Sequence, residues 1–240
     1  MFQVYHKSDI GLKRQSNQDA FRINQDMNLF IIADGMGGHN GGETASQNAV
    51  DIIEACFISK NKIKDPEDLI ISAMEKANKE IFLQSLEDRD LKGMGTTCSL
   101  VFIDDKIHMG HVGDSRVYFI KEDIKQVSVD HTLVERLIAK GEINREEGRN
   151  HPRKNMITRA VGTEADIRVD YAVFDRQAAD HIIICSDGLT GKVEDQEILS
   201  IVKKNPNQVG VDYLVALANE RGGEDNISLI LVTQDSNKEV

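Results

Sequence analysis

Nine short runs, some alternating between apolar and polar positions and some wholly apolar, have the length of a β-strand. The predicted strands lie near Gln3–Lys7, Ala20–Ile23, Leu29–Ala33, Thr97–Ile103, Lys106–Val112, Val117–Ile120, Ile167–Phe174, His181–Cys185 and Ile227–Val232. The turn signal Asp104-Asp105-Lys106 separates two of them, so we expect that pair to form a hairpin.

Helical spacing marks three other segments. Residues 43–57 place one apolar face on Ala45, Ala49, Ile52, Ile53, Cys56 and Phe57. Asp65 and Pro66 form a helix start, with an N-cap followed by proline at the first helical position. The face that follows consists of Ile70, Ala73, Ala77 and Ile81. A third face consists of Val211, Leu214, Val215 and Ala218, and Gly222 is expected to end that helix.

The order of these elements indicates the fold class. Strands come first, then two helices, more strands, a short helical insert, strands, two helices and a final strand. This order is not a regular βαβα alternation, so it predicts an α+β fold with antiparallel sheets packed against paired helices. Only the last residues, Gln234–Val240, have the composition of a loose tail.

The segment 131–162 differs from the rest of the chain. A capping box from Thr132 to Glu135 opens a predicted helix that runs through Lys140 and stops at Gly141. The stretch 144–155 is then almost wholly polar and carries four basic residues. Taken alone, this stretch is typical of a solvated surface excursion. The alternative is a flap beside an active site that touches the substrate.

Composition limits the partners. The 240 residues are 40% hydrophobic, which argues against disorder, and the formal net charge is −11. Nucleic acids and anionic membranes are therefore poor partners, because both require a basic face. The start of the chain has no basic-then-apolar leader and no stretch approaches a membrane span, so we expect a soluble, cytoplasmic protein. The three cysteines, Cys56, Cys98 and Cys185, are expected to be small buried hydrophobes.

Four aspartates stand at the ends of apolar runs. Three adjoin glycine, in Asp34-Gly35, Gly113-Asp114 and Asp187-Gly188, and the fourth is in Asp225-Asn226. Carboxylates that gather at strand ends repel one another, so stability does not explain them. Hard divalent cations take oxygen ligands and do explain them. The pattern predicts a metal-dependent hydrolase, with a site that only tertiary folding could assemble.

The glycine-rich loop at residues 35–42 fits neither of the two common nucleotide-binding motifs. A dinucleotide fingerprint would need glycine where Asn40 stands. A P-loop would need lysine where Glu43 stands, and a carboxylate there would repel phosphate. The dense acidic loop of an EF-hand is also absent. Glycine is therefore expected to serve close approach of the backbone to a ligand.

Arg14 and Asp19 precede a predicted strand in Arg14-Gln15-Ser16-Asn17-Gln18-Asp19. The planar fork of arginine suits bidentate binding of phosphate oxygens. Without the acidic cluster, a surface-loop arginine would be the better interpretation.

Taken together, these motifs resemble the Mg/Mn-dependent serine/threonine protein phosphatases, the PPM family of type 2C, in their compact bacterial form. The motifs that carry the resemblance are Arg14-x-x-Asn17-Gln18-Asp19, Asp34-Gly35-Met36-Gly37-Gly38-His39, Gly93-Met94-Gly95-Thr96-Thr97, Val112-Gly113-Asp114-Ser115-Arg116, Ser128-x-Asp130-His131, Ser186-Asp187-Gly188-Leu189 and Asp225-Asn226. They span about residues 9–232, so we expect one catalytic domain over 1–240, with 131–162 as the flap.

The resemblance implies a four-layer αββα sandwich and a set of metal ligands at one edge. Asp34 would bridge two Mn²⁺ or Mg²⁺ ions, and the carbonyl of Gly35 would bind the first. Asp187 and Asp225 would hold the second, and Asp19 would act mainly through bound water. Asp114 with Asp187 would hold a weaker third ion.

The implied reaction is direct hydrolysis of phosphoserine and phosphothreonine. Water or hydroxide bound to the metals would attack phosphorus, with Arg14, Asp34 and Asp187 as the catalytic set. Some members place histidine directly after Asp-Gly as the proton donor, but Met36 stands there in this chain. His39 is the nearest substitute. His108, His111, His131 and His151 are expected to be structural.

The implied partners are phosphorylated proteins, including a serine/threonine kinase and its substrates. The enzyme itself is expected to be a monomer. Thiol-based phosphatase chemistry is disfavoured, because no cysteine stands in a Cys-x5-Arg loop. Two other classes stay open. A metal phosphodiesterase would use similar acids but normally needs a basic track, and a binding module would keep the fold without the chemistry.

Overall fold

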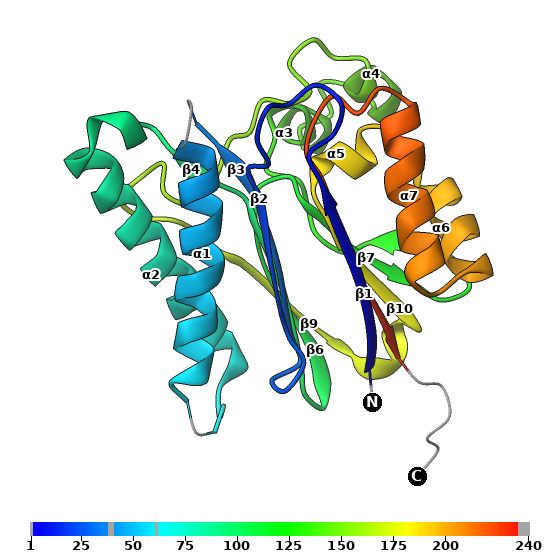
Figure 1. The fold of residues 1–240 in the computed structure, drawn as a ribbon, viewed down its shortest axis with the longest axis horizontal. Coiled ribbons are helices and arrows are strands. Elements are labelled where there is room, and N and C mark those ends of the chain that lie inside the picture. The colour runs from blue at the N-terminus through cyan, green and yellow to red at the C-terminus, as the bar shows by residue number, and fades with distance from the viewer. Residues whose placement is uncertain (1, 38–40, 61, 235–240) are drawn as a thin grey trace.

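Two antiparallel β-sheets lie face to face in the middle of the molecule, and helices cover the outer face of each (Figure 1). The structure is a computed structural model that describes residues 2–37, 41–60 and 62–234. The strands are β1 (Phe2–Asp9), β2 (Asp19–Asn24), β3 (Leu29–Met36), β4 (Gly95–Thr96), β5 (Cys98–Ile103), β6 (Lys106–Val112), β7 (Arg116–Ile120), β8 (Ile124–Gln126), β9 (Asp170–Asp175), β10 (His181–Cys185) and β11 (Ile227–Gln234). The α-helices are α1 (Gly41–Ile58), α2 (Pro66–Glu87), α3 (Leu133–Ala139), α4 (Arg145–Arg149), α5 (Asp187–Thr190), α6 (Asp195–Lys204) and α7 (Gln208–Glu220).

Each sheet draws strands from both halves of the chain. Sheet A has the order β1-β11-β10-β7-β8, and sheet B has the order β2-β3-β5-β6-β9 with β4 paired to β3. Every pairing is antiparallel. Neighbouring strands therefore begin and end at the same two edges, and the ends of β3 and β10 are delivered to one edge of the sandwich.

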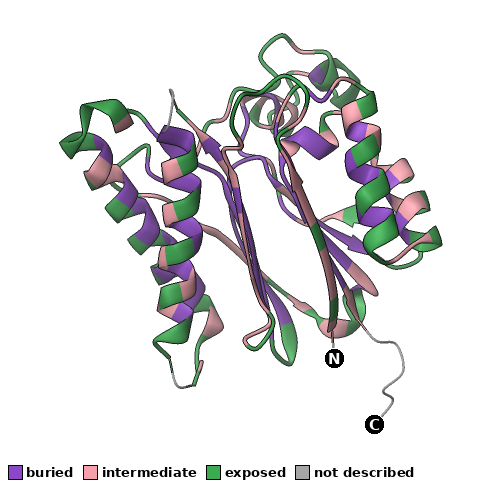
Figure 2. Cartoon of the chain, viewed as in Figure 1, coloured by how far each residue is buried: buried purple, intermediate pink, exposed green. Residues whose placement is uncertain are grey.

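Three apolar layers hold the four structural layers together. The layer between the sheets includes Phe30, Ile32, Val117, Ile184 and Ile230. A second layer packs α1 and α2 on sheet B, and a third packs α6 and α7 on sheet A. Both faces of the central strands are covered, which explains why β3, with Phe30, Ile31 and Ile32 all fully buried, is apolar at successive positions (Figure 2). The predicted αββα sandwich is confirmed.

The sequence missed two short strands. β4 has only two residues, Gly95 and Thr96, and β8 is a three-residue edge strand with polar Lys125 and Gln126. Neither has a periodicity that can be recognised. Two predicted strands start too early, because β5 begins at Cys98 and β9 begins at Asp170. The predicted hairpin is present, with Ile103 opposite Ile107.

The predicted helices are confirmed, and the polar stretch after Gly141 contains one more. Asn144 and Glu147 form a capping box that opens α4. Gly148 lets α4 approach α3 closely, because a Cβ there would lie 2.8 Å from a methyl carbon of Val134. The stretch 144–155 thus contains a short helix that packs on α3, and apart from Gly148 its residues are exposed or partly exposed, as expected for a surface excursion.

The end of the chain and one of the cysteines differ slightly from the predictions. Gln234 belongs to β11 rather than to a tail, and residues 235–240 lie outside the described residues. Cys98 and Cys185 are buried as predicted, but Cys56 is only half-buried, and all three are free thiols. Within the described ranges, no helix combines the length and the apolar composition needed to cross a lipid bilayer.

Candidate active site

Five predicted acidic residues meet at one edge of the sandwich. Asp19 opens β2 and stands directly opposite Asp34 of β3 in the strand register. Asp187 follows β10 at the start of α5, and Asp225 lies two residues before β11. Asp114 lies in the turn between β6 and β7. Sheet B therefore supplies two of the acids, sheet A supplies two, and the turn that joins the sheets supplies the fifth.

Burial and mutual repulsion both affect the pKa values of these acids. Burial, followed by repulsion from Asp19, Asp187, Asp114 and Asp225, raises the pKa of Asp34 well above its ordinary value. Burial also raises the pKa of Asp19, Asp114 and Asp187, with a further contribution in each case from neighbouring acids. Such a cluster is unfavourable unless protons or cations neutralise it.

The hydrogen bonds at this edge leave two carboxylate oxygens available. Oδ1 of Asp19 and Oδ1 of Asp187 are buried and have no hydrogen-bond partner. Buried polar atoms in proteins are almost always satisfied, so such atoms call for a ligand. Among the described residues, no three acidic, histidine or cysteine side chains are already arranged so that they could hold a metal ion together. The orphaned oxygens in a gathered acidic cluster nevertheless suit hard cations that bind oxygen.

Asp225 differs from these acids because both of its oxygens are engaged. Nη2 of Arg14 donates to Oδ2 at 2.7 Å, and the backbone N–H of Asn226 donates to Oδ1 at 2.9 Å. The hydrogen bond to Asp225 raises the pKa of the Arg14 guanidinium, and Asp34 and Asp187 add smaller electrostatic contributions. The predicted phosphate-binding arginine therefore lies at the acidic cluster, paired with one of its members.

Asn226 is a site residue whose role the sequence did not reveal. It is 4% exposed, its Oδ1 accepts from the backbone N–H of Gln18, and its Nδ2 donates to the carbonyls of Ile10 and Ser16. One side chain thus ties the loop that carries Arg14 to the start of β11. The sequence showed the Asp225-Asn226 pair, but it did not show that Asn226 would contact the loop that carries Arg14.

Two glycines beside the acids are required by close approach of backbones. A Cβ on Gly35 would lie 2.1 Å from the carbonyl oxygen of Gly42, and one on Gly188 would lie 1.9 Å from that of Asn226. No side chain fits at such distances. The interpretation of the glycine-rich loop as a close-approach device is consistent with this geometry, although the role of the Gly35 carbonyl stays a prediction.

The histidines make structural contacts. His108 is bonded to Tyr171 and Asp104, and His111 to Ser99 and the carbonyl of Val129. His131 stands at the start of the segment 131–162, where its backbone N–H donates to the carbonyl of Gly113 at 2.7 Å. His39, the candidate proton donor, lies outside the described residues.

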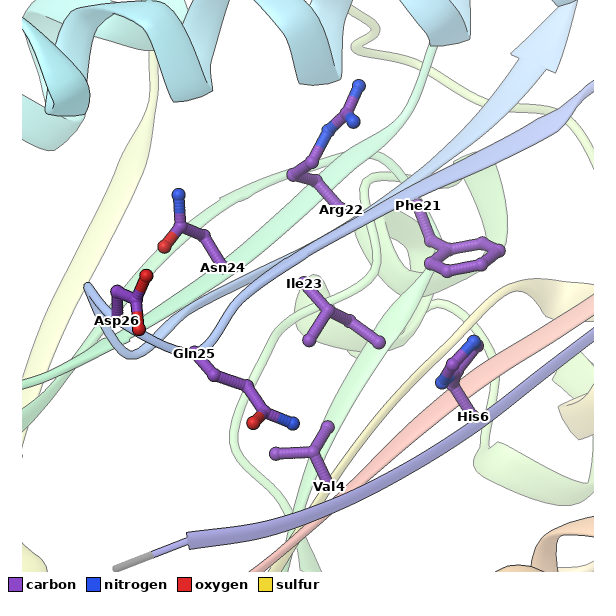
Figure 3. A pocket seen from close by; sticks show the side chains of 8 residues that line it. All are labelled: Val4, His6, Phe21, Arg22, Ile23, Asn24, Gln25 and Asp26. Carbon is purple, nitrogen blue, oxygen red and sulfur yellow. The ribbon is translucent and has the colours of Figure 1, made fainter.

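A hollow of about 610 Å³ opens elsewhere, between the edge strands β1 and β2 (Figure 3). The side chains that line it include Val4, His6, Phe21 and Ile23, and none of the predicted site residues is among them. The rings of His6 and Phe21 lie 4.9 Å apart, centre to centre. The acidic edge, rather than this hollow, therefore carries the chemistry predicted from the sequence.

Comparison with known proteins gives the family. The protein phosphatase 2C family model matches residues 12–221. The serine/threonine phosphatase stp of Listeria monocytogenes serotype 4b is 37% identical over 95% of this chain and 94% of its own. The crystal structure of serine/threonine phosphatase Stp1 from Staphylococcus aureus superposes with a TM-score of 0.93, at 33% identity, over 98% of this chain and 96% of that one. The catalytic domain of the phosphatase PstP, in complex with two manganese ions, matches with a TM-score of 0.87 at 29% identity, over 97% of each chain.

The chain belongs to the protein phosphatase 2C family, and it is a serine/threonine phosphatase. This confirms the family predicted from the motifs and favours a phosphatase over a phosphodiesterase or a binding module. Metal dependence is a general property of the family.

Proposed function

We propose that this chain removes phosphate from phosphoserine and phosphothreonine in proteins, with Mn²⁺ or Mg²⁺ bound at the acidic edge. The observation that supports this most directly is the pair of buried, unpartnered oxygens on Asp19 and Asp187 within a cluster of five acids. The net charge of −11 leaves the phosphopeptide, rather than a nucleic acid, as the natural phosphate ester.

The ligand assignment follows the positions of the acids. Asp34 and the carbonyl of Gly35 would hold one ion, and Asp34, Asp187 and Asp225 would hold the other, with Asp19 acting through water. Asp114 and Asp187 would hold a weaker third ion. When bound, the ions would supply a nucleophile at neutral pH and stabilise the charge on the phosphoryl oxygens.

Arg14 would bind the phosphate, and its present contact explains how. Its guanidinium is about half exposed and is paired with Asp225. Once Asp225 neutralises a cation instead, the same fork is free to bind two phosphate oxygens. The chain therefore keeps its phosphate-binding group beside the cluster before any phosphate arrives.

The remaining predictions concern the surroundings of the site. The segment 131–162 would act as the flap that touches substrate. The positive charge of its Lys154 contributes to lowering the pKa of Glu224, which is the sequence neighbour of Asp225. His39 would be the candidate proton donor to the leaving group. We further propose a single catalytic domain over 1–240, a monomer in the cytoplasm that opposes a serine/threonine kinase in signalling.

The test is a phosphopeptide assay with Mn²⁺, with chelator, and with Asp187→Ala. We expect Asp187→Ala to lose nearly all turnover and to stay folded, because it removes a ligand of two ions and relieves repulsion among the acids. Asp105→Ala is the control, since Asp105 is exposed in the hairpin turn at the opposite end of the sandwich. If Asp187→Ala kept more than a tenth of the wild-type kcat in saturating Mn²⁺, the metal-site assignment would be wrong.

A further inference from the structure

A buried serine connects the acids of the two sheets. Ser186 lies between the last residue of β10 and Asp187, and it is fully buried. Its Oγ donates to Oδ2 of Asp19, at 2.8 Å, and Asp19 opens β2 in the opposite sheet. Ser186 is thus bonded to one member of the acidic cluster and is the sequence neighbour of another.

The direction of the hydroxyl is determined by its other partner. The backbone N–H of Ser228 donates to Oγ of Ser186 at 2.9 Å, and an N–H can only donate. The carboxylate of Asp19 can only accept when it is ionised. The single hydroxyl proton of Ser186 therefore points to Asp19. The backbone of Ser186 is fixed as well, because its N–H donates to the carbonyl of Ser228 at 2.9 Å.

This arrangement divides the two oxygens of Asp19. Oδ2 accepts the hydrogen bond from Ser186, while Oδ1 is buried and has no partner. The hydroxyl of Ser228 also stabilises this carboxylate, because it lowers the pKa of Asp19 as Ser186 does. The backbone N–H of Asp19 is also held, by Oδ1 of Asn17 at 3.1 Å. A carboxylate that is held at one oxygen and has no hydrogen-bond partner at the other is already oriented for a ligand before the ligand binds.

From these contacts we infer that Ser186 is a positioning residue for the cations of the proposed site. Its hydroxyl orients Asp19 and holds it at a set separation from Asp187, across the interface of the two sheets. The inference rests on the proposed function, because it concerns ions bound by these acids. Groups that orient a metal ligand typically contribute roughly 10–100-fold to metal affinity.

The experiment measures Mn²⁺ binding by calorimetry, independently of turnover. We expect Ser186→Ala to bind Mn²⁺ roughly 10–100-fold more weakly than wild type. Ser186→Thr keeps the hydroxyl and should retain most of the affinity. Ser85→Ala is the matched control, because Ser85 is also buried but its hydroxyl donates to a carbonyl within α2. If Ser186→Ala did not fold, Ser186→Cys would replace it, since it keeps the volume and lacks the strong donor.

A double-mutant cycle separates positioning from a general loss of packing. In an Asp19→Ala background, Ser186→Ala should cause no further loss of Mn²⁺ affinity, because its partner is gone. An equal loss in both backgrounds would overturn the inference, and so would unchanged affinity in Ser186→Ala alone. If the wild-type protein bound no Mn²⁺, the proposed function itself would fail, which is a different outcome.

Discussion

Arg14 and Asp225 form an ion pair, with 2.7 Å between Nη2 of Arg14 and Oδ2 of Asp225. The two residues were predicted to have separate tasks, one for phosphate and one for metal. If the proposed roles hold, a cation at Asp225 and a phosphate at Arg14 would each compete with this ion pair. On the proposed assignment, binding of the cation would favour binding of the phosphate, because it would release the guanidinium.

Arg14→Ala should weaken phosphate capture while leaving the acids able to bind metal. Loss of one charge-assisted bidentate contact should lower kcat/KM by an amount that corresponds to about 1.5–3 kcal/mol of binding free energy. The ion pair itself is partly exposed and contributes little to stability, so the midpoint of unfolding should hardly change. Steady-state kinetics with a phosphopeptide, together with Mn²⁺ titration, would measure both effects.

Two controls test whether the fork or the charge matters. Arg14→Lys keeps the charge but loses the planar fork, so it should recover only part of the loss. Lys13→Ala removes the neighbouring exposed cation and should have a much smaller effect. An unchanged kcat/KM in Arg14→Ala would make Arg14 an ordinary surface-loop residue.

The fold could be predicted from the sequence wherever both faces of an element are buried. The run from Leu29 to Ala33 is apolar at every position because helices cover one face of sheet B and sheet A covers the other. The edge strand β8 lacks that constraint, and its alternation is too short to recognise. Helix α4 was missed because only Gly148 among its five residues is buried.

The site was predictable as a set of acids but not as a set of contacts. Asp34 and Asp187 stood out because each ends an apolar run beside glycine. The link from Ser186 to Asp19 joins residues 167 positions apart, so no local pattern could indicate it. The same holds for Arg14 and Asp225, which are 211 positions apart.

His111 should make the protein less stable as the pH falls below neutrality. Burial, followed by the nearby His131, lowers the pKa of His111 to about 4, while the unfolded chain titrates near its ordinary value of about 6.5. Between these values the unfolded chain binds a proton and the folded chain does not. The free energy of unfolding should therefore fall by about 2 kcal/mol between pH 7 and pH 5 on account of this residue.

Urea unfolding of wild type and of His111→Gln at both pH values isolates this contribution. The acids Asp130 and Asp170 partly oppose the effect of burial, and they are present in both proteins. The acidic cluster is also common to both, so its own titration cancels in the difference. Equal pH dependence in the two proteins would contradict the prediction.

Asp114→Ala should separate binding of the two main ions from full activity. Asp114 lies in a turn after Gly113, which has a φ of +112°, and it is 6% exposed beside Asp187. It is not a member of the strand pair formed by Asp19 and Asp34, so an ion bound by Asp114 and Asp187 should be held more weakly than the other two. By calorimetry, Asp114→Ala should still bind two ions tightly, yet it should dephosphorylate phosphopeptides much more slowly than wild type or Asp105→Ala. If the tight pair were lost as well, Asp114 would belong to the primary site and the division of ligands would be wrong. If turnover were unchanged, the third ion would have no part in catalysis.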